Sequence, residues 1–265
     1  MTQRIAGAPA SKELVGIVRG GGPGLLLAHG ASSDVEDSFG VLVDHLAATN
    51  TVVAPDYPGS GATPRSATPL TLDGLADGLA GAAERAGQER FAVLGYSTGA
   101  AVAVRLATRY PERVTALVLS AGFARPNARL RVVVETWRRL AADPEALAAY
   151  LILLGWSPEW LDRRSAAEIE ALAAAIGAGL PPGADDQLDL LTRVDVRGEL
   201  EAVSVPALVV AGRHDLVVSP SHATELARLL PDVTVAELDS GHALASERPG
   251  EWAAVVTDFL ARVSV

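Results

Sequence analysis

A five-residue pattern, Gly-Tyr-Ser-Thr-Gly at residues 95–99, places a serine where it could act as a nucleophile. The pattern follows an apolar run at residues 91–94 and precedes a helical pattern at residues 100–110. A nucleophile elbow needs this context, because two glycines permit a sharp turn that exposes the serine oxygen at the carboxyl end of a sheet. The alternative is a structural serine in an ordinary strand-to-helix turn. We predict that Ser97 is the nucleophile.

A serine hydroxyl needs a base to remove its proton, and that base needs a carboxylate to orient it. After an elbow of this kind, the acid and then the histidine follow in the chain. Asp215 lies in a loop after the apolar run at residues 205–211, and His242 lies in a loop after the run at residues 233–238. Because the carboxyl ends of parallel strands share one edge of a sheet, we predict that Ser97, Asp215 and His242 form a catalytic triad.

Other residues fit the roles of base and acid less well. His29 and His45 precede the predicted nucleophile, and His222 falls in a helical pattern where a surface histidine is the ordinary expectation. Asp239 lies in the same loop as His242. That position suits an Asx turn that holds the loop better than an acid that orients the imidazole.

The oxyanion that forms during acyl transfer needs two preorganised N–H donors. The backbone of Thr98, directly after the nucleophile, can supply one, and Ala31 in the loop after the first parallel strand can supply the other. His29 in that loop could instead bind a metal ion, but no H-x-x-x-H or H-x-H spacing surrounds it. We therefore predict no metal site and no cofactor.

Short apolar runs alternate with helical patterns along the chain, as buried parallel strands alternate with helices. The runs lie at residues 25–28, 51–54, 91–95, 114–119, 205–211 and 233–238. Another run, at residues 13–18, precedes a glycine-rich turn at residues 20–24 and predicts an antiparallel hairpin at the sheet edge. We predict an α/β fold with a mostly parallel central sheet flanked by helices.

About eighty residues without a strand pattern separate the last two of these runs from the others. N-cap signals at Asp143, Ser157 and Ser165, together with apolar residues at helical spacing, predict three or four helices there. We predict that residues 122–198 form a helical cap, inserted into a core made of residues 1–121 and 199–265.

The predicted cap would lie over the carboxyl ends of the strands, where Ser97 is exposed. Three of the four tryptophans of the chain fall within it. These side chains could pack the cap helices on one another or line a substrate pocket. We predict a mainly apolar pocket, with candidate lining residues His29, Tyr96, Trp137, Tyr150, Leu154, Trp156 and Trp160.

The composition is that of a globular chain: of 265 residues, 49% are hydrophobic and 20% are charged. The net charge of −10 repels nucleic acid and anionic lipid. The absence of cysteine excludes thiolate nucleophiles and fits a reducing compartment. No secretory signal or membrane span is evident. We therefore predict a cytoplasmic protein with a small-molecule substrate and no nucleic-acid or membrane partner, while the oligomeric state stays open.

Taken together, the motifs resemble the α/β-hydrolase fold family, specifically single-domain bacterial members with a helical cap. The matching segments follow one another over nearly the whole chain: His-Gly at 29–30, Asp-Tyr-Pro-Gly-Ser-Gly at 56–61, Gly-Tyr-Ser-Thr-Gly at 95–99, Tyr-Pro-Glu-Arg-Val at 110–114, Pro-Ala-Leu-Val-Val-Ala-Gly at 206–212 and Gly-His at 241–242. The resemblance implies the α/β-hydrolase fold, with a structural turn at residues 56–61. Members that open epoxides or remove halogens carry Asp where this chain has Ser97, which disfavours those activities.

The leading hypothesis is a serine hydrolase that cleaves a carboxylic ester or thioester of a mainly apolar small molecule through an acyl-Ser97 intermediate. Carbon-carbon bond hydrolases and lactonases are similar to this core. The same triad could also serve a non-hydrolytic lyase or cyclase of a natural-product pathway, although hydroxynitrile lyases use a cap lysine and this cap has none. A binding module built on an inactive scaffold would not need all three triad residues.

Overall fold

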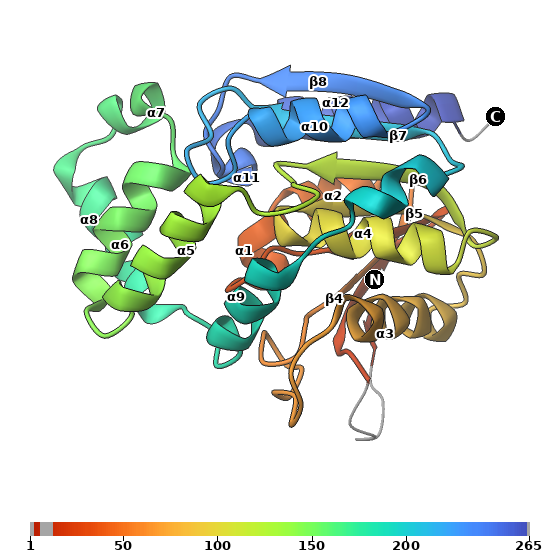
Figure 1. Cartoon of the computed structure of the whole chain (residues 1–265), viewed down its shortest axis with the longest axis horizontal. Helices are drawn as coiled ribbons and strands as arrows, with labels where there is room; N and C mark the ends of the chain where they lie inside the picture. The colour runs from red at the N-terminus through yellow and green to blue at the C-terminus, as the bar shows by residue number, and fades with distance from the viewer. Residues whose placement is uncertain (1–2, 6–12, 264–265) are drawn as a thin grey trace.

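An eight-stranded sheet runs through the middle of the computed structural model, which describes residues 3–5 and 13–263 (Figure 1). Its strand order is β1-β2-β4-β3-β5-β6-β7-β8. β1 and β2 pair antiparallel, as do β2 and β4, and every other neighbouring pair is parallel. The strands are β1 (Gln3–Ile5), β2 (Gly16–Gly20), β3 (Gly24–Ala28), β4 (Thr51–Pro55), β5 (Phe91–Tyr96), β6 (Val114–Ser120), β7 (Ala207–Gly212) and β8 (Val233–Leu238).

The six predicted parallel strands are confirmed as β3 to β8, with small differences at their ends. β7 begins at Ala207, two positions after the predicted start, because Pro206 has no N–H to donate to a ladder. β8 is the outermost strand and is largely exposed, whereas β3 and β5 are buried along their full length. The apolar run at residues 233–238 thus forms an edge strand and not a central one.

The run predicted as one arm of an edge hairpin is antiparallel, but its partner was predicted wrongly. It forms β2, which pairs with β4 and not with the next strand in the chain, β3. Gly20 (φ +83°) and Gly22 (φ +120°) turn the chain beside the start of β4, where Thr51 donates to the carbonyl of Pro23. β4 therefore lies between β2 and β3, and β1 occupies the edge.

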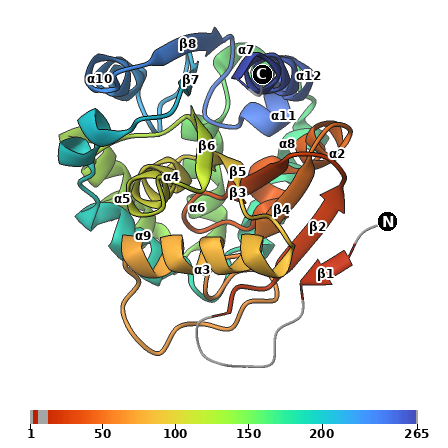
Figure 2. The ribbon, with the colours of Figure 1, turned by 90° about the vertical axis from the view of Figure 1, so that its right-hand side faces the viewer.

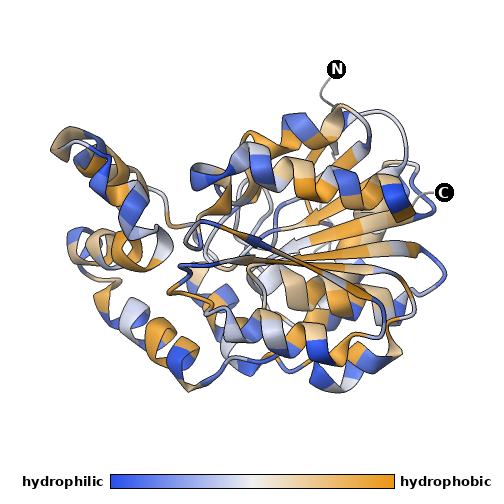
Figure 3. Cartoon of the chain, turned by 90° about the horizontal axis from the view of Figure 1, so that it is seen from above, coloured by the Kyte–Doolittle hydropathy of each residue, from blue (hydrophilic) through white to orange (hydrophobic). Residues whose placement is uncertain are grey.

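Helices cover both faces of the sheet (Figure 2). α3 (Leu72–Arg85), α4 (Thr98–Arg109) and α10 (Ser221–Leu229) pack on one face, and α1 (Val35–Phe39), α2 (Leu42–Ala47), α11 (Leu244–Glu247) and α12 (Pro249–Val263) contribute to the apolar core on the other. Alternate side chains of β3 serve the two layers, with Leu26 on one side and Leu25 and Leu27 on the other. Figure 3 shows the apolar strands between these helical layers.

Between β6 and β7 the chain forms a helical insertion, which stands to one side of the sheet (Figure 1; Figure 3). The predicted N-caps Asp143, Ser157 and Ser165 are confirmed, each accepting a hydrogen bond from a backbone N–H of the helix that it opens. The helices are α5 (Ala128–Leu140), α6 (Pro144–Gly155), α7 (Pro158–Asp162), α8 (Ala166–Ala178), α9 (Ala184–Arg193) and the 3₁₀ helix η1 (Arg197–Ala202).

The insertion holds more helices than the three or four predicted, since α5 to α9 are five α-helices. α9 begins at Ala184, and its N-cap residue Gly183 has no side chain that could accept a cap hydrogen bond, so the sequence carries no side-chain N-cap signal for it. The division into a core and a separate cap domain stays a prediction. In residues 13–263, no helix has both the length and the apolar character that a bilayer crossing needs.

Candidate active site

Ser97 lies in a sharp turn between β5 and α4, at the carboxyl end of the sheet. Its backbone has φ +55° and ψ −121°, a conformation that residues with a side chain rarely adopt. The flanking glycines are required here: a Cβ at Gly99 would overlap the carbonyl oxygen of Ala28, and one at Gly95 would overlap that of Gly99 itself. The predicted turn geometry is therefore present. Ser97 is one of the residues that line a cavity.

Ser97, His242 and Asp215 form one hydrogen-bonded line. Nε2 of His242 is 3.2 Å from Oγ of Ser97, and Nδ1 is 2.7 Å from Oδ2 of Asp215. With the ring proton on Nδ1, His242 donates to Asp215 and can accept the proton of Ser97. The other carboxylate oxygen of Asp215 accepts from the backbone N–H groups of Val217 and Val218, so the fully buried side chain has a fixed orientation.

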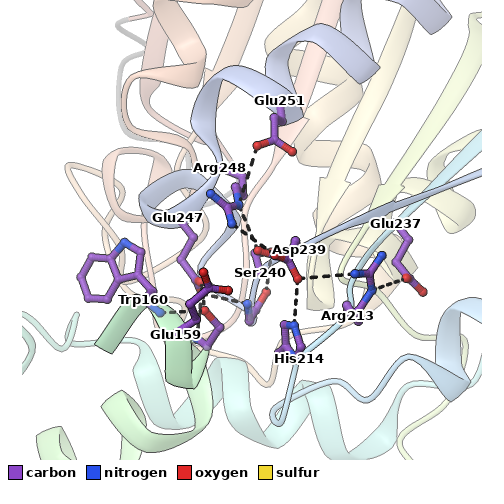
Figure 4. Close-up of polar contacts among 12 residues, drawn as sticks. Glu159, Trp160, Arg213, His214, Glu237, Asp239, Ser240, Glu247, Arg248 and Glu251 are labelled. Atoms are coloured by element: carbon purple, nitrogen blue, oxygen red, sulfur yellow. Dashed lines mark hydrogen bonds and ion pairs between the residues drawn. The ribbon is translucent and has the colours of Figure 1, made fainter. Parts of the chain in front are cut away.

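The competing acid, Asp239, has other partners (Figure 4). It accepts from Nε2 of His214 at 2.9 Å and lies 3.6 Å from Arg213 and 3.4 Å from Arg248. The hydrogen bond from His214 and the nearby arginines hold the pKa of the Asp239 carboxyl below its usual range. Asp239 is therefore part of a surface ion cluster, while the carboxylate beside His242 belongs to Asp215.

Two side chains hold the backbone around His242. The hydroxyl of Tyr96 donates to the carbonyl oxygen of His242 at 2.7 Å, and burial together with the charge of Asp215 raises the pKa of the Tyr96 phenol, which keeps it protonated. Oε1 of Glu247 accepts from the N–H of Gly241 at 2.8 Å and from the N–H of Ser157 at 3.0 Å. Its other oxygen accepts from the Ser157 hydroxyl, so Glu247 joins the loop of His242 to the start of α7 (Figure 4).

The two predicted oxyanion donors lie beside Ser97. Thr98 is the first residue of α4, and Ala31 lines the same cavity as Ser97. Within the described residues, neither backbone N–H has a hydrogen-bond partner. The loop that contains Ala31 is held by Ser38, whose Oγ accepts from the N–H of Gly30 at 3.1 Å. Both N–H groups are thus available to an oxyanion.

His29 does not line the pocket, contrary to the prediction. It is fully buried; its Nδ1 lies 2.8 Å from the Gly30 carbonyl, and its Nε2 accepts from the N–H of Tyr57 at 2.8 Å. The Tyr57 ring packs on the imidazole with 3.9 Å between ring centroids. Burial lowers the pKa of His29 to about 4. With both nitrogens engaged, His29 is a neutral structural residue that ties two loops together, which also leaves no nitrogen for a metal ion.

A cavity of about 530 Å³ opens over Ser97 and His242. The predicted pocket residues Tyr96, Trp137 and Trp156 line it. Nearly half of its lining residues come from the helical insertion and are mainly apolar, and a core segment supplies a polar and acidic end. The apolar wall includes Leu130, Val133, Val134, Leu151, Leu172, Ile176, Leu188 and Leu191, and the polar end includes Ser32, Ser33, Asp34, Glu36, Asp37 and Ser38.

Three other predicted pocket residues face elsewhere. α6 presents Leu151 and Gly155 to the cavity, while Tyr150 turns toward α5 and donates from its hydroxyl to the Val133 carbonyl. Leu154 packs against the apolar core. Trp160 lies behind Trp156 with 6.0 Å between ring centroids, under the guanidinium of Arg164. These three side chains support the wall of the pocket and do not form it.

His222, expected at the surface, is only 3% exposed. It packs near the ring of Phe123, and burial lowers its pKa. A helical pattern alone could not show that this position of α10 faces the core. Among the described residues, His222 makes no hydrogen bond to Ser97, Asp215 or His242, although the charge of Asp215 acts on its pKa.

A second and wider cavity, of about 790 Å³, lies between α9 and residues 65–70, away from Ser97. Its charged side chains are already paired, Arg65 with Asp186 and Arg138 with Asp185. No nucleophile with a histidine partner lines it. The cavity over Ser97 and His242 is therefore the candidate active site.

Several residues that hold the site were not predicted. Gln187 on α9 accepts from the N–H of Ser32 across 155 positions of sequence, and Glu247 reaches Ser157 across 90 positions. Neither belongs to a motif whose spacing signals its role. For the apolar wall a signal did exist, since Leu130 and Val133 recur at helical spacing, but a pattern of this kind fits a packed core equally well.

The comparison that decides the family concerns the sequence as a whole. The pattern that defines the alpha/beta hydrolase fold family matches residues 23–249. This chain is an α/β hydrolase. The predicted fold class is thereby confirmed, with the strand order and the serine turn described above.

Curated relatives resemble this hydrolase over most of their length. Pyrrolizixenacetamide deacetylase of Xenorhabdus hominickii is 31% identical over 246 residues, which cover 92% of each chain. "Putative carbamate hydrolase RutD" of Azorhizobium caulinodans is 29% identical over 226 residues, which cover 83% of this chain and 85% of the relative.

Solved structures share the fold. A thermophilic esterase from Thermogutta terrifontis has a TM-score of 0.82 at 24% identity over the whole of both chains. An enol-lactonase from Burkholderia xenovorans has a TM-score of 0.80 at 24% identity, covering 92% of this hydrolase and 95% of that chain. At this level of identity the likeness concerns the fold alone.

Proposed function

We propose that this hydrolase cleaves a carboxylic ester or thioester of a mainly apolar small molecule through an acyl-Ser97 intermediate. The hydrogen-bonded line from Ser97 through His242 to Asp215, at the floor of a cavity large enough for a small substrate, carries the proposal. Ester hydrolysis is chemistry that a serine, a base and two N–H donors can perform without a cofactor.

In the first half-reaction, His242 accepts the proton of Ser97 while Oγ attacks the substrate carbonyl carbon. The carbonyl oxygen becomes an oxyanion, to which Ala31 and Thr98 donate from their backbone N–H groups. Asp215 stabilises the imidazolium and keeps the ring oriented. When the tetrahedral intermediate collapses, Nε2 of His242 returns its proton to the leaving alcohol or thiol, and the acyl group stays on Ser97.

In the second half-reaction, water replaces the leaving group near Nε2 of His242. The base takes a proton from this water as it attacks the acyl carbon, and the same two N–H groups receive the oxyanion again. Collapse releases the carboxylic acid and returns the proton to Ser97. Atoms and charges balance over the two steps, with one water consumed for each ester bond cleaved.

The lining of the cavity supports an uncharged acyl group. Aliphatic and aromatic side chains of the insertion form nearly half of the wall, and the charged residues along it are Asp34, Glu36 and Asp37. No described Lys or Arg lines this cavity. Arg129 and Arg131, which could have pointed inward, donate to backbone carbonyls elsewhere. An anionic acyl chain would therefore lose its hydration without gaining a cationic partner.

The relatives favour a second candidate, the cleavage of an N-acyl bond. One relative is named as a deacetylase and another as a carbamate hydrolase. The same steps apply to an amide, with His242 protonating a leaving amine in place of an alcohol. An N-acetyl amine and a carbamate therefore belong in any substrate panel.

A fluorophosphonate probe tests the proposal directly, because it modifies an activated serine. We expect stoichiometric labelling at Ser97 and none in Ser97→Ala, which keeps the fold. We also expect acetyl, hexanoyl or aryl esters to be cleaved with a kcat/KM at least tenfold above that of a dicarboxylate monoester. A folded wild-type protein that neither reacts with the probe nor cleaves any member of the panel would contradict the proposed function.

A further inference from the structure

The start of α9 contacts the loop that carries the predicted oxyanion donor Ala31, here called the oxyanion loop (residues 30–33). The side chain of Gln187 on α9 is only 1% exposed, and its Oε1 accepts from the N–H of Ser32 at 2.8 Å. The hydroxyl of Ser32 in turn donates to the carbonyl of Ala184, at the first turn of the same helix. A buried polar side chain from the insertion thus bonds directly to the residue after Ala31.

The partners of Gln187 leave its amide a single orientation. Nε2 donates to Oγ of Ser60 at 2.8 Å and to the carbonyl of Pro58 at 3.3 Å, so the carbonyl end must face Ser32. Oγ of Ser60 then donates to the carbonyl of Ser33 at 2.6 Å. The amide therefore secures two successive residues of the oxyanion loop, one directly and one through Ser60.

The loop needs this support because its backbone is strained. Ser32 has φ +57°, and a residue in this region persists only where its surroundings hold it there. Each peptide group is planar, so the N–H of Ser32 and the carbonyl of Ala31 turn together. The donor N–H of Ala31 shares its plane with the carbonyl of Gly30, which lies 2.8 Å from Nδ1 of His29, while the N–H of Gly30 donates to Ser38. The loop is thus held before Ala31 by His29 and Ser38 and after it by Gln187 through Ser32, so release of Ser32 would let Ala31 shift and carry its N–H away from Ser97.

We infer that Gln187 is a positioning residue of the oxyanion hole, which it fixes from the helical insertion by holding Ser32. The inference rests on the proposed function, because it takes Ala31 as an oxyanion donor. Gln187 itself lies behind the loop, where its amide bonds protein groups, and acts on the reaction only through the direction of the Ala31 N–H.

Replacement of Gln187 by leucine keeps the volume and removes the acceptor. We expect kcat of Gln187→Leu on a short-chain ester to fall by about 10- to 100-fold, somewhat less than the loss of a whole oxyanion donor, with KM changed by less than about threefold. Affinity for a trifluoromethyl ketone, whose adduct with Ser97 carries an oxyanion, should fall by the same factor. Affinity for the alcohol product, which carries none, should stay at the wild-type value.

Two further variants separate positioning from simple packing. Gln187→Glu keeps an oxygen that can accept from Ser32, so its kcat and its ketone affinity should lie between those of wild type and Gln187→Leu. Asp186→Asn is the matched control: it breaks the neighbouring ion pair between α9 and Arg65 without touching the oxyanion loop, and we expect wild-type kcat.

The outcomes distinguish this inference from the proposed function. If the wild type cleaves esters and both Gln187 variants keep its kcat and ketone affinity, only the role of Gln187 is overturned. If both variants bind the ketone and the alcohol product with equally weakened affinity, Gln187 merely packs, and the inference is again wrong. If the wild type itself shows neither ester cleavage nor labelling of Ser97, the proposed function fails and the positioning role fails with it.

Discussion

Two helices of the insertion line the same cavity but are attached to the molecule in different ways. α9 buries Leu188, Leu190 and Leu191 and bonds to two loops of the core through Gln187. α8 has a mainly apolar, alanine-rich sequence, yet none of its residues is buried. It packs chiefly against α6. Both contribute to the pocket wall, α9 through Leu188 and Leu191 and α8 through Leu172 and Ile176.

This contrast teaches that one insertion can hold two walls with separate tasks. α9 is hydrogen-bonded through Gln187 to the loop of the proposed oxyanion donor Ala31, so a change there should alter kcat and stability. α8 contributes apolar side chains to the cavity, so a change there should alter which substrate is preferred. Substitutions on the two walls, and in the core beneath them, test this division.

The largest effect is expected in the core, at the acid of the triad. Asp215→Asn keeps the oxygen that accepts from Val217 and Val218 but loses control of the His242 tautomer. In a protease triad this change costs up to about 10⁴ in kcat. We expect a loss of about 10³ to 10⁴ with a nearly unchanged melting temperature, measured with the best ester of the panel. Asp239→Asn is the control, and a larger loss in that variant would reverse the assignment.

The next effect concerns the carboxylate that joins α7 to the loop of His242. Glu247→Ala leaves the N–H groups of Gly241 and Ser157 without their acceptor in a buried site. We expect the free energy of unfolding to fall by about 2–4 kcal/mol, because each buried group left unpaired costs about 1–3 kcal/mol. Urea unfolding measures the loss, and Glu247→Gln, which keeps one oxygen, should recover at least half of it. Equal losses in both variants would show that the carboxyl oxygens are not what matters.

His29, which precedes the oxyanion loop, should make the stability of the protein depend on pH. Burial lowers the pKa of His29 to about 4, whereas the unfolded chain takes up this proton near 6.5, so the unfolded state binds more protons as the pH falls through that interval. Stability from His29 is therefore present above pH 6.5 and should decrease by about 2 kcal/mol between pH 7 and pH 5.

His29→Gln, which cannot take up the proton, isolates this contribution. The difference between the unfolding free energies of wild type and variant should shrink by that amount over the same interval. Other buried groups such as His222 titrate equally in both proteins and cancel in the difference. Parallel stability curves would mean that His29 does not stay neutral on folding.

The smallest effect separates the two walls of the pocket. Ile176→Ala on α8 should change the kcat/KM ratio of hexanoyl to acetyl esters by about 3- to 30-fold, since a few methylene contacts are worth roughly 1–2 kcal/mol. Its melting temperature should stay within about 2 °C of wild type. Leu191→Ala on α9 removes an apolar side chain that is 6% exposed and should cost about 2–4 kcal/mol of stability. The division would be wrong if the two variants exchanged these signatures.

Local patterns predicted the parts of the site that depend on chain order. Ser97, Asp215 and His242 each follow an apolar run, and parallel strands bring the ends of such runs together, so their meeting could be inferred without coordinates. The N-caps of the insertion were equally accessible, because a cap is a contact between residues three apart. In both cases the decisive geometry is either local or imposed by the fold class.

The remaining features depend on which way a helix is rotated and which strand lies beside which. Helical spacing shows that Tyr150, Leu151 and Leu154 are apolar neighbours but not which of them faces the cavity, and only Leu151 does. Similarly, β2 has the period of an antiparallel strand whichever partner it takes. Gln187 is the extreme case, since its role arises from a contact across 155 positions that no local pattern encodes.

The φ of +55° at Ser97 affects the stability of the folded protein. Glycine adopts this conformation without strain, whereas alanine, like serine, is strained in it. The usual ranking should therefore invert: Ser97→Gly should be about 1 kcal/mol more stable than Ser97→Ala, although glycine gives the unfolded chain more freedom. Thermal unfolding of the two inactive variants measures the difference. The strained turn thus lowers stability at the position whose side chain the proposed reaction needs.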